Sequence, residues 1–282
     1  MSVLVQLALA GEGLWRALLQ VRAGRLWVPW LALGALQAAL LLALPGFAHP
    51  ALSPWLAPLV RGVGGEEALH YPGFFGALPA LYARADLVLG ALAGAVVVGW
   101  STVLFATCWR GHDVAPGTAW ASVAPRVVAL VLALLPLQVL VVTLDVGLAQ
   151  AVAGEGGLVR KLAQLVSLGG VAVARALFLY VPALVVLERR GIAGAFAALP
   201  RAWARGFWAA LLLGAVRVAV TSPFQRLDRV GDLLVGRGSP ELVGGLVLVR
   251  IVAELAVSFV LVGAATLAYL GAVAEAEPEA RA

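Results

Sequence analysis

The stretch VGGLVLVRIVAELAVSFVLVGAATLAYL, from Val243 to Leu270, carries only two charged side chains, Arg250 and Glu254. An α-helix of about 20 mostly apolar residues is long enough to cross the hydrocarbon core of a bilayer. The stretch therefore predicts a membrane-spanning helix. It also places an arginine and a glutamate where a charge costs roughly 2.5–3.5 kcal/mol on insertion scales.

Five further stretches meet the same length and composition criterion. With the last one, the predicted spans are 26–45, 87–108, 127–149, 162–187, 207–224 and 243–270. Hydrophobic residues make up 62% of the chain and charged residues 12%, against about 25% charged residues in soluble domains. The chain is predicted to be an all-α, polytopic membrane helical bundle of six transmembrane helices, with residues 1–282 forming a single integral membrane domain. Pro136 and Pro182 are expected to kink the third and fourth spans.

The first 25 residues are predicted to form an amphipathic interfacial helix. Leu7, Leu14, Leu18 and Val21 recur at helical spacing and predict its apolar face. A cleaved signal peptide is the alternative, because residues 8–10 read Ala-Leu-Ala, but a basic segment before the apolar run is missing.

The distribution of Lys and Arg predicts the orientation, because cytoplasmic loops carry an excess of these residues. One side holds ten: Arg16, Arg22, Arg25, Arg110, Arg126, Arg189, Arg190, Arg201, Arg205 and Arg281. The other holds seven: Arg61, Arg84, Arg160, Lys161, Arg226, Arg229 and Arg237. The first side is therefore predicted to be cytoplasmic, with both termini and a tail at 271–282 on that side of a bacterial inner membrane.

The long connection at 46–86 is predicted to lie on the outer face. It contains Pro54-Trp55-Leu56 and Pro72-Gly73-Phe74-Phe75, which are too apolar for a free loop. One or two short helices on the membrane surface are expected, and a re-entrant segment is the alternative.

The segments before the first, third and fifth spans share a pattern of Trp or Phe, Ala and Arg. In the second of them, Trp120 and Ala121 precede Pro125 and Arg126, and in the third Phe196 and Ala197 precede Pro200 and Arg201. We interpret them as three tandem units, each an interfacial helix followed by a two-helix hairpin. The alternative is that short cytoplasmic links between membrane helices generally have this composition.

One block has a counterpart in known proteins. Leu177–Glu188 reads LFLYVPALVVLE, RRGIAGAF follows directly, and Leu199–Trp208 reads LPRAWARGFW. The block resembles one in six-span bacterial inner-membrane proteins that are similar to the membrane domain of glycerophosphodiester phosphodiesterases. It departs from their Ala-x-x-x-Ser-Trp pattern by having Leu199 and Pro200 before Arg201. The resemblance implies a membrane fold and brings no catalytic residues, because the block belongs to the membrane portion of those enzymes.

Motifs for catalysis, cofactors or metals are not found in the sequence. It has no His-Glu-x-x-His, no Walker-type glycine loop and no Gly-x-Ser-x-Gly. His49 and His70 share the outer connection with two glutamates, but their spacing matches no metal-ligand pattern. The net charge of +5 is spread singly or in pairs between apolar runs, as in membrane anchors rather than nucleic-acid-binding proteins. We expect no enzyme, no cofactor, no metal and no nucleic-acid partner.

The candidate ligand-binding residues are the charges inside the last three spans: Arg175, Arg217, Arg250 and Glu254. Arg250 and Glu254 are four residues apart and are expected to pair on one helical face. Asp145 is a second candidate partner. Even with it, positive charge is in excess, which predicts a site for an anion such as a lipid phosphate. The alternative is that the arginines only bond to carbonyl groups or water and hold the last three spans together.

Two functions follow from these residues. The first is an integral membrane protein that binds or moves an anionic or amphiphilic, lipid-like molecule. The second is a membrane scaffold or assembly subunit whose interfacial helices dock a partner protein.

Overall fold

The computed structural model describes the chain except residues 1, 153, 155, 227–233 and 275–282. The structure is 88% helical, and its described residues contain no β-strand. Six helices in this part of the chain are long and apolar enough to cross a membrane: 24–48, 73–109, 116–142, 157–186, 192–224 and 242–272. The predicted class, an all-α polytopic membrane bundle, is confirmed. Arg229, Arg281 and most of the predicted tail lie outside the described residues.

The second membrane helix begins much earlier than predicted. α4 (Gly73–Leu89) continues through a π-helical turn at Gly90–Gly94 into α5 (Ala95–Trp109). The helix begins at Gly73, before the predicted span start at residue 87, because Pro79, Arg84 and Asp86 interrupt the apolar pattern without ending the helix. Arg84 and Asp86 are therefore helical residues rather than part of the outer connection.

The shortened outer connection contains one short α-helix, as expected. α2 (Val28–Ala43) ends in a 3-10 turn at Leu44–Ala48, followed by α3 (Ser53–Gly64) and a second 3-10 turn at Glu66–Leu69. Val60 and Ala68 from this segment are buried beside Phe74 of α4. The apolar residues of the connection thus cover the end of α4.

The fourth span is broken where its proline predicted a kink. α9 (Gly157–Phe178) and α10 (Val181–Val186) are separated at Leu179 and Tyr180, and Pro182 lies in the first turn of α10. Proline is tolerated there because the N–H it lacks has no partner in a first turn. In the third span, α7 (Val127–Val142) continues through Pro136. A π-helical turn at Thr143–Gly147 and α8 (Leu148–Ala151) follow it.

The fifth span begins with the segment predicted to be a third interfacial helix. α11 (Ile192–Thr221) is one continuous helix with Pro200 inside it. The other two segments predicted to be interfacial helices form separate helices: α1 (Val3–Leu19) and α6 (Pro116–Val123). The tandem repeat stays a prediction, and its third unit lacks a separate first helix.

α1 contacts the rest of its unit mainly through small residues, whereas its predicted apolar face is partly exposed. Its buried residues are Gln6, Ala10, Gly13 and Ala17, whereas Leu18 is 50% exposed. A Cβ added at Gly13 would lie 3.0 Å from the carbonyl oxygen of Ala264, so the two backbones are in close contact. Small residues allow such an approach between membrane helices, and larger apolar side chains then face outward.

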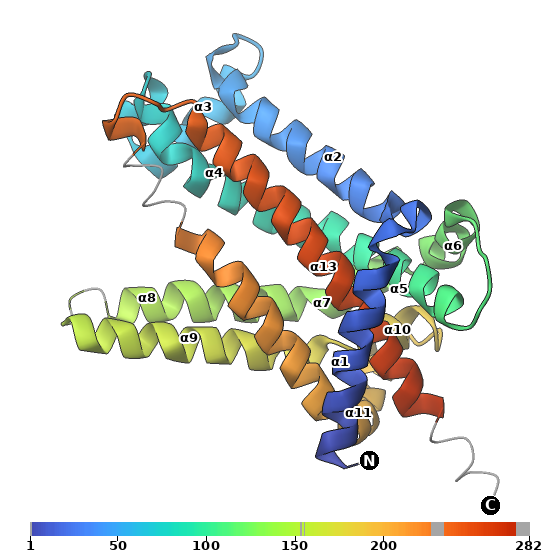
Figure 1. The fold of residues 1–282 in the computed structure, drawn as a ribbon. Coiled ribbons are helices and arrows are strands. Elements are labelled where there is room, and N and C mark those ends of the chain that lie inside the picture. The colour runs from blue at the N-terminus through green and yellow to red at the C-terminus, as the bar shows by residue number, and fades with distance from the viewer. Residues whose placement is uncertain (1, 153, 155, 227–233, 275–282) are drawn as a thin grey trace, which may run out of the picture. The chain divides into compact units, whose positions relative to one another are not determined.

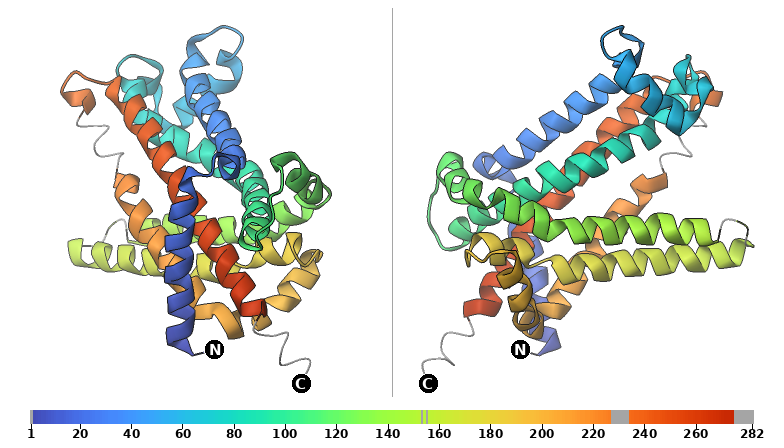
Figure 2. Two further views of the ribbon diagram at one scale, coloured as in Figure 1. Left: turned by 45° about the vertical axis from the view of Figure 1, so that its right-hand side comes forward. Right: turned by 180° about the vertical axis from the view of Figure 1, so that it is seen from behind.

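The chain forms two compact units. Unit 1 comprises residues 1–29, 91–220 and 257–282, and unit 2 comprises 30–90 and 221–256, so α13 (Leu242–Ala274) contributes to both. In unit 1, α10 packs against α5 and α7, and α7 lies beside α9 (Figures 1 and 2). In unit 2, the buried cluster joins α3, α4 and the first half of α13 through residues such as Val60, Leu78 and Val247.

Candidate functional site

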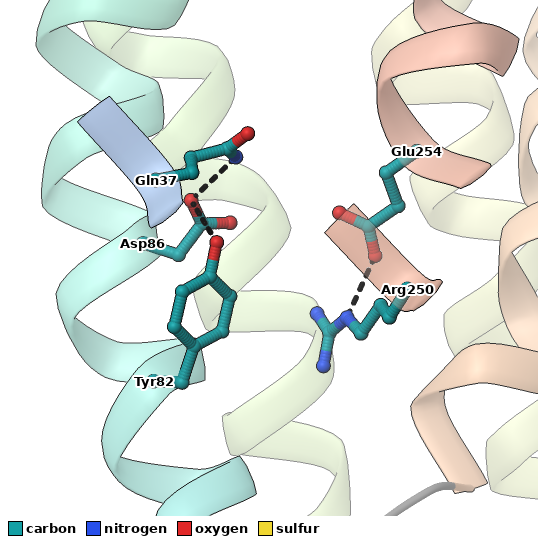
Figure 3. A network of polar contacts seen from close by, with 5 residues as sticks. All are labelled: Gln37, Tyr82, Asp86, Arg250 and Glu254. Carbon is teal, nitrogen blue, oxygen red and sulfur yellow. Dashed lines mark hydrogen bonds and ion pairs between the residues drawn. The ribbon is translucent and has the colours of Figure 1, made fainter. Parts of the chain in front are cut away.

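The four charges predicted to bind a ligand fall into two sets. Arg250 and Glu254 belong to unit 2, and Arg175 and Arg217 belong to unit 1. Arg250 Nε donates to Glu254 Oε1 at 2.8 Å, and the two side chains are only 16% and 26% exposed (Figure 3). The predicted ion pair is confirmed.

The two arginines of unit 1 lie in settings that stabilise them. Arg217 Nη1 donates to Ser258 Oγ on α13 at 3.2 Å. Arg175 lies in the last turn of α9, because that helix ends at Phe178. The negative end of the helix dipole favours a cation there. The sequence predicted that Arg175 lies in the middle of the fourth span. The break before Pro182 places it in the last turn of a helix within that span.

A further carboxylate lies beside the ion pair of unit 2. Asp86 Oδ1 accepts hydrogen bonds from Gln37 Nε2 at 2.8 Å and from the Tyr82 hydroxyl at 3.4 Å. Figure 3 shows this group on the side facing Arg250 and Glu254. The set therefore contains two carboxylates and one guanidinium. For these three charges the predicted excess of positive charge does not hold. Asp86 was not counted in that prediction, because the sequence placed this residue in the connection at 46–86. The side chain of Asp145, the other proposed partner, is not among the described ones.

A cavity of about 180 Å³ lies within unit 1, between the α10 region, the first half of α11 and the end of α13. Its polar lining contains three arginines, one glutamate and two tyrosines: Arg190, Arg201, Arg205, Glu188, Tyr180 and Tyr269. Small apolar side chains complete it: Leu184, Ala198, Ala202 and Ala272. With one carboxylate against three guanidinium groups, the lining carries a formal charge of +2.

One of these arginines is paired and two are not. Arg190 Nε donates to Glu188 Oε2 at 2.5 Å, and the Tyr269 hydroxyl donates to Oε1 of the same glutamate. Within the described part of the chain, Arg201 and Arg205 have neither a hydrogen-bond nor an ion-pair partner. They are one turn apart on α11, so both reach the cavity from the same face of the helix.

The break in the fourth span positions one wall of this cavity. Tyr180, at the break, is 1% exposed, and its hydroxyl donates to the carbonyl oxygen of Gly206 at 2.8 Å. A Cβ at residue 206 would lie 2.5 Å from that hydroxyl, so only glycine fits. The ring of Tyr180 is 5.8 Å from the ring of Tyr269.

The turn between α10 and α11 positions the acidic side of the cavity. Arg189 adopts φ 57°, the left-handed region, which costs a residue with a Cβ about 1–2 kcal/mol. The backbone N–H groups of Glu188 and Arg190 then bond back to the carbonyls of Ala183 and Leu184. This turn places the side chains of Glu188 and Arg190 next to each other.

Sequence reasoning missed this cavity, because Arg201 and Arg205 were counted as interfacial anchors. The available signal was their spacing of four residues on a helical segment. A second signal was the block from Leu177 to Trp208, which supplies every lining residue except Tyr269 and Ala272.

Comparisons with protein-family models, curated proteins and solved structures found no match for this chain. The resemblance therefore rests on the residues of the block alone. No group of three or more His, Cys, Asp or Glu side chains in the described part of the chain is placed to hold a metal ion.

Proposed function

We propose that this multi-pass membrane protein binds a phosphate-bearing amphiphile and that the phosphate occupies the cavity of unit 1. The observation that carries the proposal is the pair of unpartnered arginines in a cavity whose lining has a formal charge of +2. A guanidinium group presents a planar fork of N–H donors that matches phosphate oxygens. Arg201 and Arg205 are therefore the proposed ligands.

The remaining lining residues support an amphiphile with a small headgroup. Glu188 is already bonded to Arg190 and Tyr269, so its negative charge is compensated within the cavity wall. The volume is below the roughly 300–1,000 Å³ of pockets that enclose a drug-sized ligand. A headgroup in the cavity with its chains in the bilayer is consistent with this size.

The side of the membrane follows from the predicted orientation. All three cavity arginines belong to the set predicted to face the cytoplasm. The proposed ligand is therefore a lipid of the inner leaflet.

Native mass spectrometry of the purified protein tests the proposal. Wild type is expected to retain anionic phospholipid in preference to neutral lipid, and R201Q/R205Q is expected to lose that preference. R110Q is the matched control, because Arg110 is exposed, lies on the same predicted side and does not line the cavity. Equal retention of anionic lipid by wild type and R201Q/R205Q would exclude the cavity as the headgroup site.

A further inference from the structure

The polar network of unit 2 has more negative than positive charge at membrane depth. Asp86 lies on α4 and Glu254 on α13, and Arg250 is the one cation among the five described residues of this network (Figure 3). With both carboxylates ionised, the formal charge is −1. A net charge inside a membrane protein is costly, and a titratable group often removes it by taking up or releasing a proton.

The two carboxylates have different partners. Glu254 is bonded to the guanidinium of Arg250. Asp86 accepts hydrogen bonds from two neutral donors, Gln37 from α2 and Tyr82 from its own helix. Asp86 is therefore the carboxylate whose charge is less well compensated.

Gln37 supplies an independent observation. Its side chain is 94% buried, with 6% relative exposure, and its Oε1 has no hydrogen-bond partner in the described structure. The same amide donates through Nε2 to Asp86 Oδ1, so the unpartnered oxygen belongs to an amide that is already bonded to the carboxyl group, and it points away from that group in Figure 3. An amide and a neutral carboxylic acid can form a cyclic pair with two hydrogen bonds, N–H to O=C and O–H to O=C. Once the amide turns so that Oε1 faces the carboxyl group, one proton on Asp86 Oδ2 would supply the missing donor for Gln37 Oε1.

We propose that Asp86 and Gln37 form a proton-binding site within the membrane part of unit 2. Hydronium in the surrounding water donates one proton to Asp86 Oδ2 and becomes water, so that one O–H bond breaks as another forms, and the formal charge of the network goes from −1 to zero. The groups facing this site are Tyr82 from α4, Arg250 and Glu254 from α13, and the neutral Gln37 from α2 (Figure 3). The site does not depend on the phosphate site of unit 1, and it adds proton binding to the activities of this protein.

Infrared spectroscopy in an ester-free detergent tests the proposal, because the C=O band of a protonated carboxylic acid is separate from the carboxylate bands. At neutral pH, wild type is expected to show one such band that shifts in D₂O. D86N is expected to lose it. Q37L is expected to keep it at a shifted frequency, because the acid then lacks its amide partner. D113N is the matched control and is expected to keep the band unchanged, since Asp113 is exposed and pairs with Arg25 in the other unit.

D86N is expected to fold like the wild type, because an asparagine amide can make the same two hydrogen bonds to Gln37 as a protonated aspartate. Its helical circular dichroism and gel-filtration profile are expected to equal those of wild type. The absence of the band from wild type at neutral pH would overturn the proposal, as would its survival in D86N. Loss of the wild-type band on addition of Na⁺ at constant pH would also overturn it, because the site would then take a metal cation.

Discussion

Replacing one partner of the Arg250–Glu254 pair at a time should give unequal losses of stability. R250Q removes the cation that pairs with Glu254 and leaves this carboxylate buried without an opposite charge, beside the protonated Asp86. E254Q leaves Arg250 with an amide oxygen that still accepts from Nε, and Asp86 can supply the opposite charge by ionising.

The expected magnitudes follow from the burial of the pair. Removing one partner of a fully buried ion pair costs 3–5 kcal/mol, as a rough range. Because the two side chains are 16% and 26% exposed, we expect the lower end, about 3 kcal/mol, for R250Q. For E254Q we expect about 1 kcal/mol, because a hydrogen bond to a charged acceptor is replaced by a weaker one to a neutral amide.

Thermal unfolding in detergent, followed by circular dichroism, measures the difference. At roughly 2–4 °C per kcal/mol, R250Q should lower the midpoint by about 6–12 °C and E254Q by about 2–4 °C. The double variant R250Q/E254Q should be more stable than R250Q, since it removes the carboxylate that lost its partner. Equal losses in the two single variants, or a larger loss in E254Q, would refute the assignment of Arg250 as the cation that neutralises this network.

Three further outcomes are expected. In the same unfolding assay, G214A should destabilise the protein by about 1–3 kcal/mol, because its Cβ would lie 2.6 Å from a backbone oxygen of α9. G169A is the control and should be neutral or slightly stabilising, because a Cβ at Gly169 meets open space. The Tyr71 hydroxyl donates to Glu241 Oε1 at 2.8 Å, and this hydrogen bond raises the pKa of Tyr71. The pKa of Glu241 is lowered by its backbone hydrogen bond and by the hydrogen bond from Tyr71. The contact is therefore lost as the pH falls through the lowered pKa or rises through the raised one, and E241Q should bring the pKa of Tyr71 back toward 10 in an ultraviolet titration. A cysteine introduced near the N-terminus should react with a membrane-impermeant reagent only after the cells are opened, and labelling of intact cells would reverse the predicted orientation.

The membrane helices could be predicted from the sequence because each is a long apolar run, and this signal does not depend on tertiary contacts. The start of α4 could not be predicted, because Arg84 and Asp86 within Gly73–Leu89 are residues typical of a loop. Hydrogen bonds from Gln37 and Tyr82 satisfy Asp86 within the helix, and the one from Gln37 depends on a tertiary contact. The face through which α1 contacts its unit could not be predicted from its leucines either. A leucine stripe indicates the buried side in a soluble protein, whereas in a membrane the small residues face the neighbouring helices.

The candidate site followed only in part from the sequence. The spacing of Arg250 and Glu254 was sufficient to predict their pairing, because it depends on one helix. The cavity of unit 1 required three segments to meet, and the break at Tyr180 that brings them together depends on the local backbone before Pro182. For the same reason, the position of Arg175 in the last turn of α9 was not predicted, although this residue does lie within the long apolar helix at 157–186.

The most direct test of the central claim is the dissociation constant of a short-chain phosphatidic acid for wild type and for R201Q/R205Q, measured by equilibrium binding in detergent. Each arginine is exposed and is expected to contribute about 1 kcal/mol through charge-assisted hydrogen bonds. The double variant should therefore bind roughly 25-fold more weakly, with R110Q unchanged. A dissociation constant for R201Q/R205Q within twofold of the wild-type value would contradict the proposal that this cavity binds the phosphate.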